Sequence, residues 1–434
     1  MERNVCIAAA VALLMATTAV AQEVPQAFVG AQIVPVSGAS IDDGVLVVHK
    51  GKIVSVGSRA SVRLPSNAEQ HDVTGKWLLP GLVDTHSHVG QIAGADASGP
   101  IQPDVRALDA VNVRAASIHK ARAGGITTVN VMPGSGHLLS GQTLYLKLRA
   151  GKTVEDLAIR DSNGRITGGI KMANGTNPMK ASPFPGTRAR SAALMREQLV
   201  KAQEYRTKIE RAKGDPEKLP ARDLGLEALV EVLEGTRIVH FHTHRHDDIL
   251  TALRLGREFG FKPVLHHVSE AARVATEIAA AGVPSSIIMI DSPGGKLEAM
   301  ELLMHNGAAL ERAGAQVALH TDDGVTDSRF FLRSAGMAVR YGMSRDAAIR
   351  ALTIEGAKML AMADRVGSLE RGKDADFIVL SGDPLSTYTK VEQTWVEGHK
   401  VFDRALTDDR LAAVGGWGAG HDQDGHVAMC GGEE

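Results

Sequence analysis

Cysteine is nearly missing from this sequence, since the chain of 434 residues contains only Cys6 and Cys430. Aromatic residues are also scarce, at 4% of the chain, and Lys and Arg do not gather into basic runs. A nucleic acid or an anionic membrane is bound through a basic surface, and single strands also need aromatic stacking platforms. The sequence therefore predicts neither nucleic acid nor a membrane surface as a partner.

Long apolar runs are missing as well, because the most apolar stretch, residues 5–16, is too short to span a bilayer. Arg3 precedes this stretch and Ala19-Val20-Ala21 follows it, which is the order of a secretory signal peptide. We expect cleavage after Ala21 and a periplasmic or secreted bacterial protein with no membrane attachment. Cleavage would leave Cys430 as the single cysteine, so no intramolecular disulfide could form. A buried N-terminal helix is the alternative reading.

The sequence is rich in short apolar runs that alternate with helical stretches. Strand-like runs such as "RIVHFHTH" and "KPVLHHVS" alternate with helical ones such as "EAARVATEIAAAG", which is typical of a parallel (β/α) barrel. Runs of β character precede and follow this region. We expect an α/β protein, a (β/α)8 TIM-like barrel with a small β-sandwich domain formed by both ends of the chain. The expected segments are a signal peptide at 1–21, β-sandwich parts at 22–80 and 363–405, the barrel at 81–362 with a charged helical elaboration near 181–224, and a Gly-rich polar tail at 406–434.

Five of the predicted strands end in side chains that suit a divalent metal, and catalytic groups of a (β/α) barrel lie at these ends. His86 and His88 lie two residues apart in "GLVDTHSHVG", so both imidazoles project from one face. The other strand ends carry Lys171, His242, His267 and Asp322. Any single one of them could be an ordinary buried polar residue. Their coincidence favours a metal site, for which imidazole and carboxylate suit zinc, with manganese, iron and nickel as alternatives.

The motifs together resemble a known family. "LPGLVDTHSH", "GGITTV", "IKMANG", "VHFHTHRHDDI", "VLHHVSEA", "ALHTDD" and "VGSLERGKDADFIVL" are similar to segments of the amidohydrolase superfamily, in its imidazolonepropionase-related and secreted dipeptidase-like branch. The resemblance covers about residues 27–403. It departs from the family at Thr176 in "NGTNPM", where relatives tend to have Glu in a Gly-Glu-Asn-Pro step.

The resemblance implies roles for the residues at the strand ends. It assigns as metal ligands His86, His88, Lys171, His242, His267 and Asp322. Lys171 would bridge two ions only after carboxylation, because a free ammonium cannot ligate a metal. The Thr176 departure leaves open whether the site holds one ion or two.

Several neighbours have weaker assignments. His244 lies one step nearer the barrel mouth than His242 and is expected to contact substrate, whereas His240 is expected in the core and His246 in a loop. In the loop "GSGHLLSG" and just after it, His137 and Gln142 are further candidates for substrate contact. Asp323 competes with Asp322, while Asp247 and Asp248 are explained by the start of a helix.

The resemblance also implies the reaction, hydrolysis of an amide or peptide C–N bond in a small molecule such as a dipeptide or a cyclic amide. One or two divalent ions, zinc first, would lower the pKa of bound water to about 7. Asp322 would take the water's proton as general base and return it to the leaving nitrogen as general acid. A lactone or ester hydrolase on the same site and a metal-binding member with little turnover are the alternatives. Family members often associate, so a homo-oligomer is expected.

Overall fold

The computed structural model describes residues 24–90, 96, 98–289 and 297–415. The expected signal peptide and both cysteines lie outside these residues, so the leader remains a prediction from sequence. Within the described ranges, no helix combines the length and the apolar character needed to cross a membrane.

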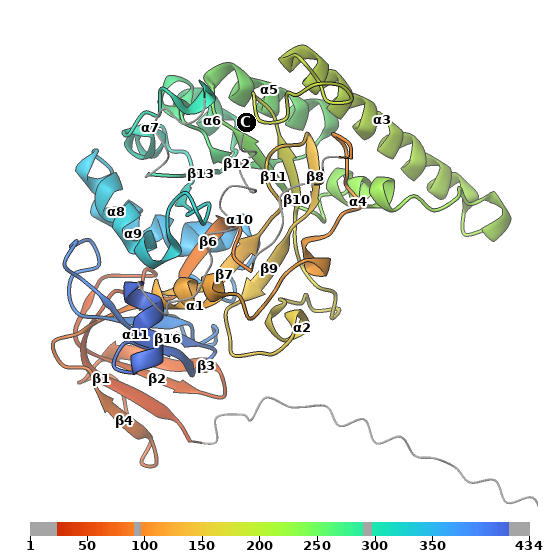
Figure 1. The fold of residues 1–434 in the computed structure, drawn as a ribbon. Helices are drawn as coiled ribbons and strands as arrows, with labels where there is room; N and C mark the ends of the chain where they lie inside the picture. Colours follow the sequence, from red (N-terminus) through yellow and green to blue (C-terminus); the bar gives the residue numbers. More distant parts are fainter. Residues whose placement is uncertain (1–23, 91–95, 97, 290–296, 416–434) are drawn as a thin grey trace, which may run out of the picture.

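Both ends of the described chain contribute to one eight-stranded sheet, at the lower left of Figure 1. Antiparallel pairing of β5 with β15, with Trp77 opposite Leu380, joins the two halves. Phe28 packs edge-on against Phe377 and Trp395, with ring centroids 4.7 and 5.0 Å apart, and forms the centre of this small core. The two chain ends therefore meet as predicted, and the description of this domain as a sandwich stays a prediction. The strands are β1 Gln26–Ile33, β2 Ile41–His49, β3 Lys52–Ser58, β4 Glu69–Asp72, β5 Trp77–Pro80, β15 Phe377–Leu380, β16 Val391–Val396 and β17 His399–Asp403.

The remaining described strands form the barrel, in a six-stranded and a three-stranded sheet. Backbone hydrogen bonds such as Asp322 N to His86 O, at 2.9 Å, connect the end of β14 to β6. These strands are almost wholly buried, which explains why they read as short apolar runs. They are β6 Leu82–Ser87, β7 Ile126–Val131, β8 Leu139–Gln142, β9 Leu144–Lys147, β10 Ile170–Ala173, β11 Val239–Thr243, β12 Pro263–His267, β13 Ser285–Ile287 and β14 Val317–Leu319.

The barrel departs from the expected parallel arrangement between β7 and β10. There β9 pairs antiparallel with β7 and β8 pairs antiparallel with β10. A parallel return needs a crossover of a dozen or more residues, and only residues 132–138 separate β7 from β8. The chain therefore turns back at the barrel mouth, and β8 and β9 together fill the place of a third parallel strand.

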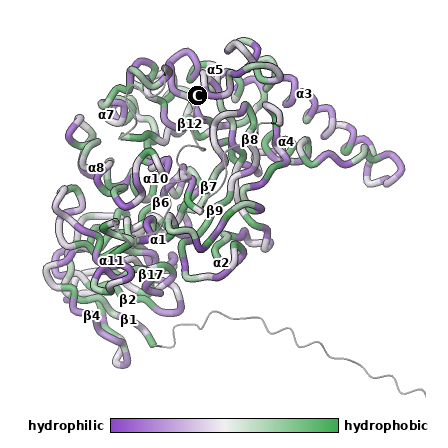
Figure 2. Tube along the Cα trace, in the orientation of Figure 1, coloured by the Kyte–Doolittle hydropathy of each residue, from purple (hydrophilic) through white to green (hydrophobic). Residues whose placement is uncertain are grey.

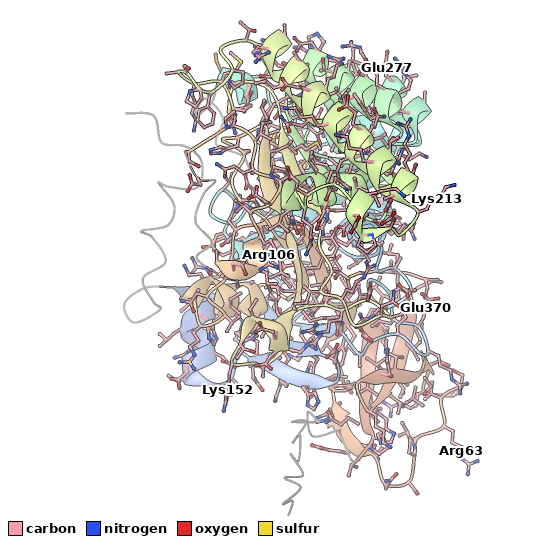
Figure 3. The ribbon with its side chains drawn as sticks, turned by 90° about the vertical axis from the view of Figure 1, so that its right-hand side faces the viewer. Arg63, Arg106, Lys152, Lys213, Glu277 and Glu370 are labelled. Carbon is pink, nitrogen blue, oxygen red and sulfur yellow. The ribbon has the colours of Figure 1, made fainter. Side chains whose placement is uncertain are left out.

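Helices surround the barrel (Figure 1). Helix α3 corresponds to the charged elaboration expected near 181–224; it extends away from the barrel, and much of it is hydrophilic (Figure 2). In the turned view of Figure 3, Lys213 lies at its far end and Arg63 lies in the small domain. The helices are α1 Ala116–Ala123, α2 Val154–Leu157, α3 Arg188–Ala212, α4 Leu224–Leu233, α5 His246–Phe259, α6 Ala275–Ala281, α7 Asn306–Arg312, α8 Phe331–Arg340, α9 Arg345–Ala351, α10 Ile354–Met359 and α11 Thr407–Val414.

Helix α11 corrects one expectation, because residues 406–434 were expected to form a polar tail throughout. Its sequence "TDDRLAAV" begins with two acidic residues, which favour a helix N-terminus, and Asp409 accepts a 2.7 Å hydrogen bond from Asp403 N. The Gly-rich composition that suggested a tail begins only after Val414.

A buried ion cluster joins the barrel to the small domain. Lys147 on β9 is fully buried, and its Nζ lies 2.8 Å from Asp374 Oδ2 and 2.7 Å from Asp376 Oδ2. Both aspartates immediately precede β15, in the "GKDADF" segment. This explains in physical terms why the return to the small domain carries the Asp-Ala-Asp pattern.

Candidate metal centre

The carboxyl ends of the barrel strands bring a set of imidazoles and a carboxylate together in the interior. His86 and His242 lie one residue before the ends of β6 and β11, His267 ends β12, and Asp322 follows β14. All are buried. Three groups have ligand atoms within 4.8 Å of one another: His86, His88 and Asp322; His86, His267 and His320; and His242, His244 and His267.

Asp322 lies among three of these imidazoles. Its Oδ1 is 2.8 Å from His88 Nε2 and 3.3 Å from His86 Nε2, and its Oδ2 is 3.9 Å from His267 Nε2. The Nδ1 of His88 lies 2.8 Å from the carbonyl oxygen of Met132, which can only accept, so Nδ1 carries the hydrogen. His88 Nε2 therefore faces the carboxylate, together with His86 Nε2. Two imidazole nitrogens and a carboxylate oxygen at these distances form a donor set that fits a divalent metal.

Lys171 lies beside the first strand's imidazoles, as the resemblance implies. It is fully buried on β10, with its Nζ 2.9 Å from His86 Nε2 and 2.9 Å from Met132 Sδ. The structure thus brings all six predicted metal ligands to one interior region.

Hydroxyl groups fix the orientation of two further rings. His244 Nδ1 lies 2.6 Å from Ser269 Oγ, and His320 Nδ1 lies 2.8 Å from Ser286 Oγ. Metal-binding imidazoles are commonly held in this way through the ring nitrogen that does not ligate. In both rings the hydroxyl contacts Nδ1 rather than Nε2.

Backbone strain collects at the same strand ends. His267, Val268 and Asp322 have φ angles of 69°, 44° and 49°. A left-handed conformation costs about 1–3 kcal/mol at each such residue, and it is most unusual for β-branched valine. Strain of this kind is typical of functional sites, where the surrounding structure holds a side chain in position.

Burial keeps the imidazoles in the form that binds metal. It lowers the pKa of His86 well below the usual value, with the Lys171 charge adding to the effect. Burial likewise lowers the pKa of His320 to about 3. Because only the neutral ring ligates a metal, both residues stay competent throughout the neutral range.

The four alternating histidines of "VHFHTHRH" have different surroundings, and His246 lies in α5 rather than in the expected loop. His242 and His244 face the cluster, with ring centroids 4.6 Å apart. His240 is a core residue, because its Nε2 lies 2.8 Å from Tyr145 Oη and its Nδ1 lies 3.0 Å from His266 Nε2. His246 begins α5, and its Nδ1 lies 2.6 Å from Glu270 Oε2.

Gln142, one of the two further substrate-contact candidates, is placed away from the cluster. It pairs with Ile170 at the start of β10, its Nε2 donates to Pro103 O at 3.1 Å, and it lines a cavity of about 1020 Å³. This cavity lies at the opposite end of the barrel, since residues just before β10 and β11 also line it. The expectation failed because β8 runs antiparallel and carries Gln142 away from the mouth.

The loop that bears His137 is linked to the metal centre through a different residue, Ser135, which contacts Asn177. Asn177, in the loop after β10, has its Nδ2 2.7 Å from Ser135 Oγ and 3.1 Å from His242 Nε2. His137 itself is buried against the Phe184 ring, at a centroid distance of 5.0 Å. Burial, and to a smaller extent the charge of Lys180, lowers the pKa of His137 to about 4. Its contact with substrate remains a prediction.

The competing carboxylates have structural partners. Asp323 accepts a 2.9 Å hydrogen bond from Ser328 N, and burial raises its pKa. Asp247 and Asp248 lie in the first turn of α5, as expected from its dipole, although the N-cap residue is Arg245. Asp248 is paired with Arg188 at 2.9 Å.

Sequence reasoning missed two residues of the centre. His320 is two positions before Asp322, so the same alternation that identified His86 and His88 could have found it. Glu298 lies 3.6 Å from His242 and 3.8 Å from His244, measured from Oε1 to each Nε2. It belongs to a short 3₁₀ turn, Leu297–Ala299, and therefore could not be found by looking for polar residues at the ends of strands.

The barrel and its buried cluster define the class of metal-binding barrel hydrolases. The model of the amidohydrolase family matches residues 77–401, and the chain belongs to this family. The family is metal-dependent, and its hydrolases act on C–N bonds. The resemblance to amidohydrolases related to imidazolonepropionase is thereby confirmed.

Individual relatives agree with this assignment. An amidohydrolase structure from Thermotoga maritima MSB8 is 35% identical, with a TM-score of 0.81 over 87% of this chain and 100% of that chain. Imidazolonepropionase from Acidiphilium cryptum is 25% identical over 378 residues, 80% of this chain and 88% of the relative. Amidohydrolase tasK from Hapsidospora irregularis is 27% identical over 414 residues, 85% of this chain but only 42% of the relative. This chain therefore spans less than half the length of tasK.

Proposed function

We propose that this protein hydrolyses an amide or peptide C–N bond of a small molecule, a dipeptide or a cyclic amide, in a metal-dependent reaction. The observation that carries the proposal is the buried approach of Asp322 Oδ1 to His88 Nε2 at 2.8 Å and to His86 Nε2 at 3.3 Å. A carboxylate so placed can both help to hold a metal ion and exchange protons with a reacting water.

The ion supplies two effects when bound, because it acidifies a water and polarises the scissile carbonyl. His86, His88 and Asp322 would hold it, and His242 and His267 are the further ligands that we propose for a site of one or two ions. Zinc is the metal we propose first, since the donors are imidazole nitrogen and carboxylate oxygen.

Asp322 would transfer the proton that amide cleavage requires. Its Oδ1 faces His86 and His88, whereas its Oδ2 lies 3.9 Å from His267 Nε2. This carboxylate would accept a proton from the attacking water and deliver it to the leaving nitrogen. The delivery is needed because an unprotonated amine is a poor leaving group.

Lys171 is proposed to act as a carbamate. Its neutral amine would add to carbon dioxide, forming a C–N bond and releasing one proton, and the new carboxylate would replace an ammonium that cannot ligate a metal. Support comes from its complete burial and its position 2.9 Å from His86 Nε2.

Metal removal and a substrate panel test the function together. We expect the zinc-loaded protein to hydrolyse at least one member of a panel of dipeptides, including Xaa-Pro, and cyclic amides, including imidazolonepropionate. Chelation should lower the rate at least about 100-fold, since the ion contributes several kcal/mol of transition-state stabilisation, and added metal should restore it.

Lactones and esters in the same panel distinguish the neighbouring reaction class, because one activated water can attack either carbonyl. Hydrolysis of lactones alone would replace the amide proposal. Absence of turnover on every amide, lactam and lactone by metal-loaded protein would contradict the hydrolase proposal and favour a binding role.

We also propose export to the periplasm or the medium, supported by the leader sequence before Gln22. The mature protein expressed in a bacterium should begin at Gln22, as measured by intact mass and N-terminal sequencing of the periplasmic fraction. Replacing Ala21 by Arg should block processing, since the cleavage site needs small residues. Recovery of full-length wild-type protein in the cytoplasm would contradict this proposal.

A further inference from the structure

We propose that Glu298 is a ligand of a second divalent ion, which it holds together with His242 and His244. The carboxylate would compensate for the acid that is missing at Thr176. The inference rests on the proposed metal-dependent function, and it identifies a ligand outside the strand ends. It also makes His244 a ligand rather than a substrate contact.

The burial of Glu298 is the first support. Its side chain is fully buried, and Oε2 accepts a hydrogen bond from the backbone N–H of Thr176. Among the described residues, Oε1 has no hydrogen-bond partner and faces the Nε2 atoms of His242 and His244. A buried carboxylate oxygen that faces two imidazole nitrogens forms with them a donor set that suits a divalent ion.

The distances between these side chains suit the ligands of one zinc ion. Two ligands bound to zinc at about 2.0–2.1 Å with tetrahedral angles lie about 3.4 Å apart. Glu298 Oε1 lies 3.6 Å from His242 Nε2 and 3.8 Å from His244 Nε2. Both distances from Glu298 Oε1 are therefore within a few tenths of an ångström of those in a zinc shell, and ligand atoms of His242 and His244 lie within 4.8 Å of one another.

The loop after β10 is shaped to admit this carboxylate. Gly175 has a φ angle of 77°, and a Cβ placed there would lie 2.1 Å from Glu298 Oε2. Only glycine combines this backbone conformation with the free space. The backbone N–H of the next residue, Thr176, donates to Glu298. The position that has no acidic side chain of its own therefore binds the carboxylate of Glu298.

The imidazoles of His242 and His244 have neighbours that bear on how they face Glu298. His244 Nδ1 is held by Ser269 Oγ at 2.6 Å, which directs Nε2 toward Glu298. His267 belongs to the same ligand group. The 3.1 Å contact of Asn177 Nδ2 with His242 Nε2 would be replaced when that nitrogen ligates the ion.

Metal stoichiometry tests the proposal independently of turnover. We would load wild-type protein, Glu298→Gln and Glu301→Gln with zinc, then measure bound metal by elemental analysis and affinity by chelator competition. Glu301 is the matched control, since it lies three residues further on, is exposed and pairs with Arg273. We expect two ions in the wild type and in Glu301→Gln. In Glu298→Gln the second ion should bind at least about 10–100-fold more weakly, as losses at metal sites typically do.

Folding is checked on metal-free protein, where Glu298→Gln should melt close to the wild type because glutamine keeps the size of the side chain and can still accept from Thr176 N. Glu298→Asp, which keeps the charge on a shorter arm, should give an intermediate affinity and serves if the glutamine variant does not fold. Wild-type affinity for both ions in Glu298→Gln, or one ion in the wild type that this variant retains, would overturn the proposal. A raised KM with unchanged metal content would also overturn it and point to recognition of a substrate ammonium. Two ions that depend on Glu298 without any turnover would leave this site in place and remove the hydrolase function instead.

Discussion

Replacing Asp322 by Asn should lower the rate of hydrolysis by about 10²–10⁴-fold, the usual contribution of a positioned general acid or base. The amide keeps the size of the side chain, but it cannot take up and return a proton. Steady-state kinetics on the substrate found with the panel gives the loss, and elemental analysis separates a lost proton transfer from lost metal.

Asp323→Asn is the matched control for this experiment. Asp323 is adjacent in sequence and half-buried, but its carboxylate accepts from Ser328 N rather than facing the imidazoles. An asparagine can keep that hydrogen bond, so we expect turnover within a few-fold of the wild type. Loss of activity in Asp323→Asn with retention in Asp322→Asn would reverse the assignment.

Replacing Lys147 by Met should lower the free energy of unfolding by about 3–5 kcal/mol, because it leaves buried carboxylates without their cation. Lys147 is fully buried and lies within 2.8 Å of both Asp374 and Asp376. Asp374 keeps further partners in Lys52 at 2.6 Å and Arg365 at 3.1 Å, whereas Asp376 depends more on Lys147. Urea unfolding of metal-free protein measures the change.

Two further variants show whether the buried charge causes the loss. Lys152→Met removes an exposed lysine and should change stability by no more than about 0.5 kcal/mol. Adding Asp376→Asn to Lys147→Met should recover part of the stability, since it neutralises the less compensated carboxyl. Equal stability of Lys147→Met and the wild type would show that the ion cluster does not hold the two domains together.

The pH dependence of this cluster follows from its pKa shifts. Burial tends to raise the pKa of Asp374, but Lys147, with Lys52 and Arg365, outweighs it and lowers the pKa to about 2. A carboxyl with a folded pKa below its ordinary value adds stability above that ordinary value, and this stability is lost as the pH falls toward 2. The pKa of Asp376 is raised by burial, so this residue acts in the opposite direction.

Most of the predicted metal site could be obtained from sequence because the information is local. Alternate residues of a strand share one face, which is enough to pair His86 with His88 and to distinguish His240, His242 and His244 along their strand. The same rule would have added His320 beside Asp322. The barrel supplies the remaining condition, since it brings the carboxyl ends of its strands to one place.

Gln142 and Glu298 show where local patterns fail. Gln142 was expected at the barrel mouth, but β8 turns back antiparallel and places it at the other end. Whether a returning segment pairs parallel or antiparallel depends on the length of its connection and on the strands available to pair with it. Neither property appears in the residues next to Gln142.

The sequence by itself indicated the class of fold, because periodicities of two and 3.6 residues decide which side chains face the interior. Its motifs also indicated the family and the candidate ligands at the strand ends. Only the tertiary structure decided that β8 and β9 replace a parallel strand, that Lys147 meets Asp374 and Asp376, and that Glu298 reaches His242. These contacts join residues far apart in the chain, 227 positions for Lys147 and Asp374 and 122 for Thr176 and Glu298. Contacts at such separations arise from packing of the whole barrel, which no short stretch of sequence encodes.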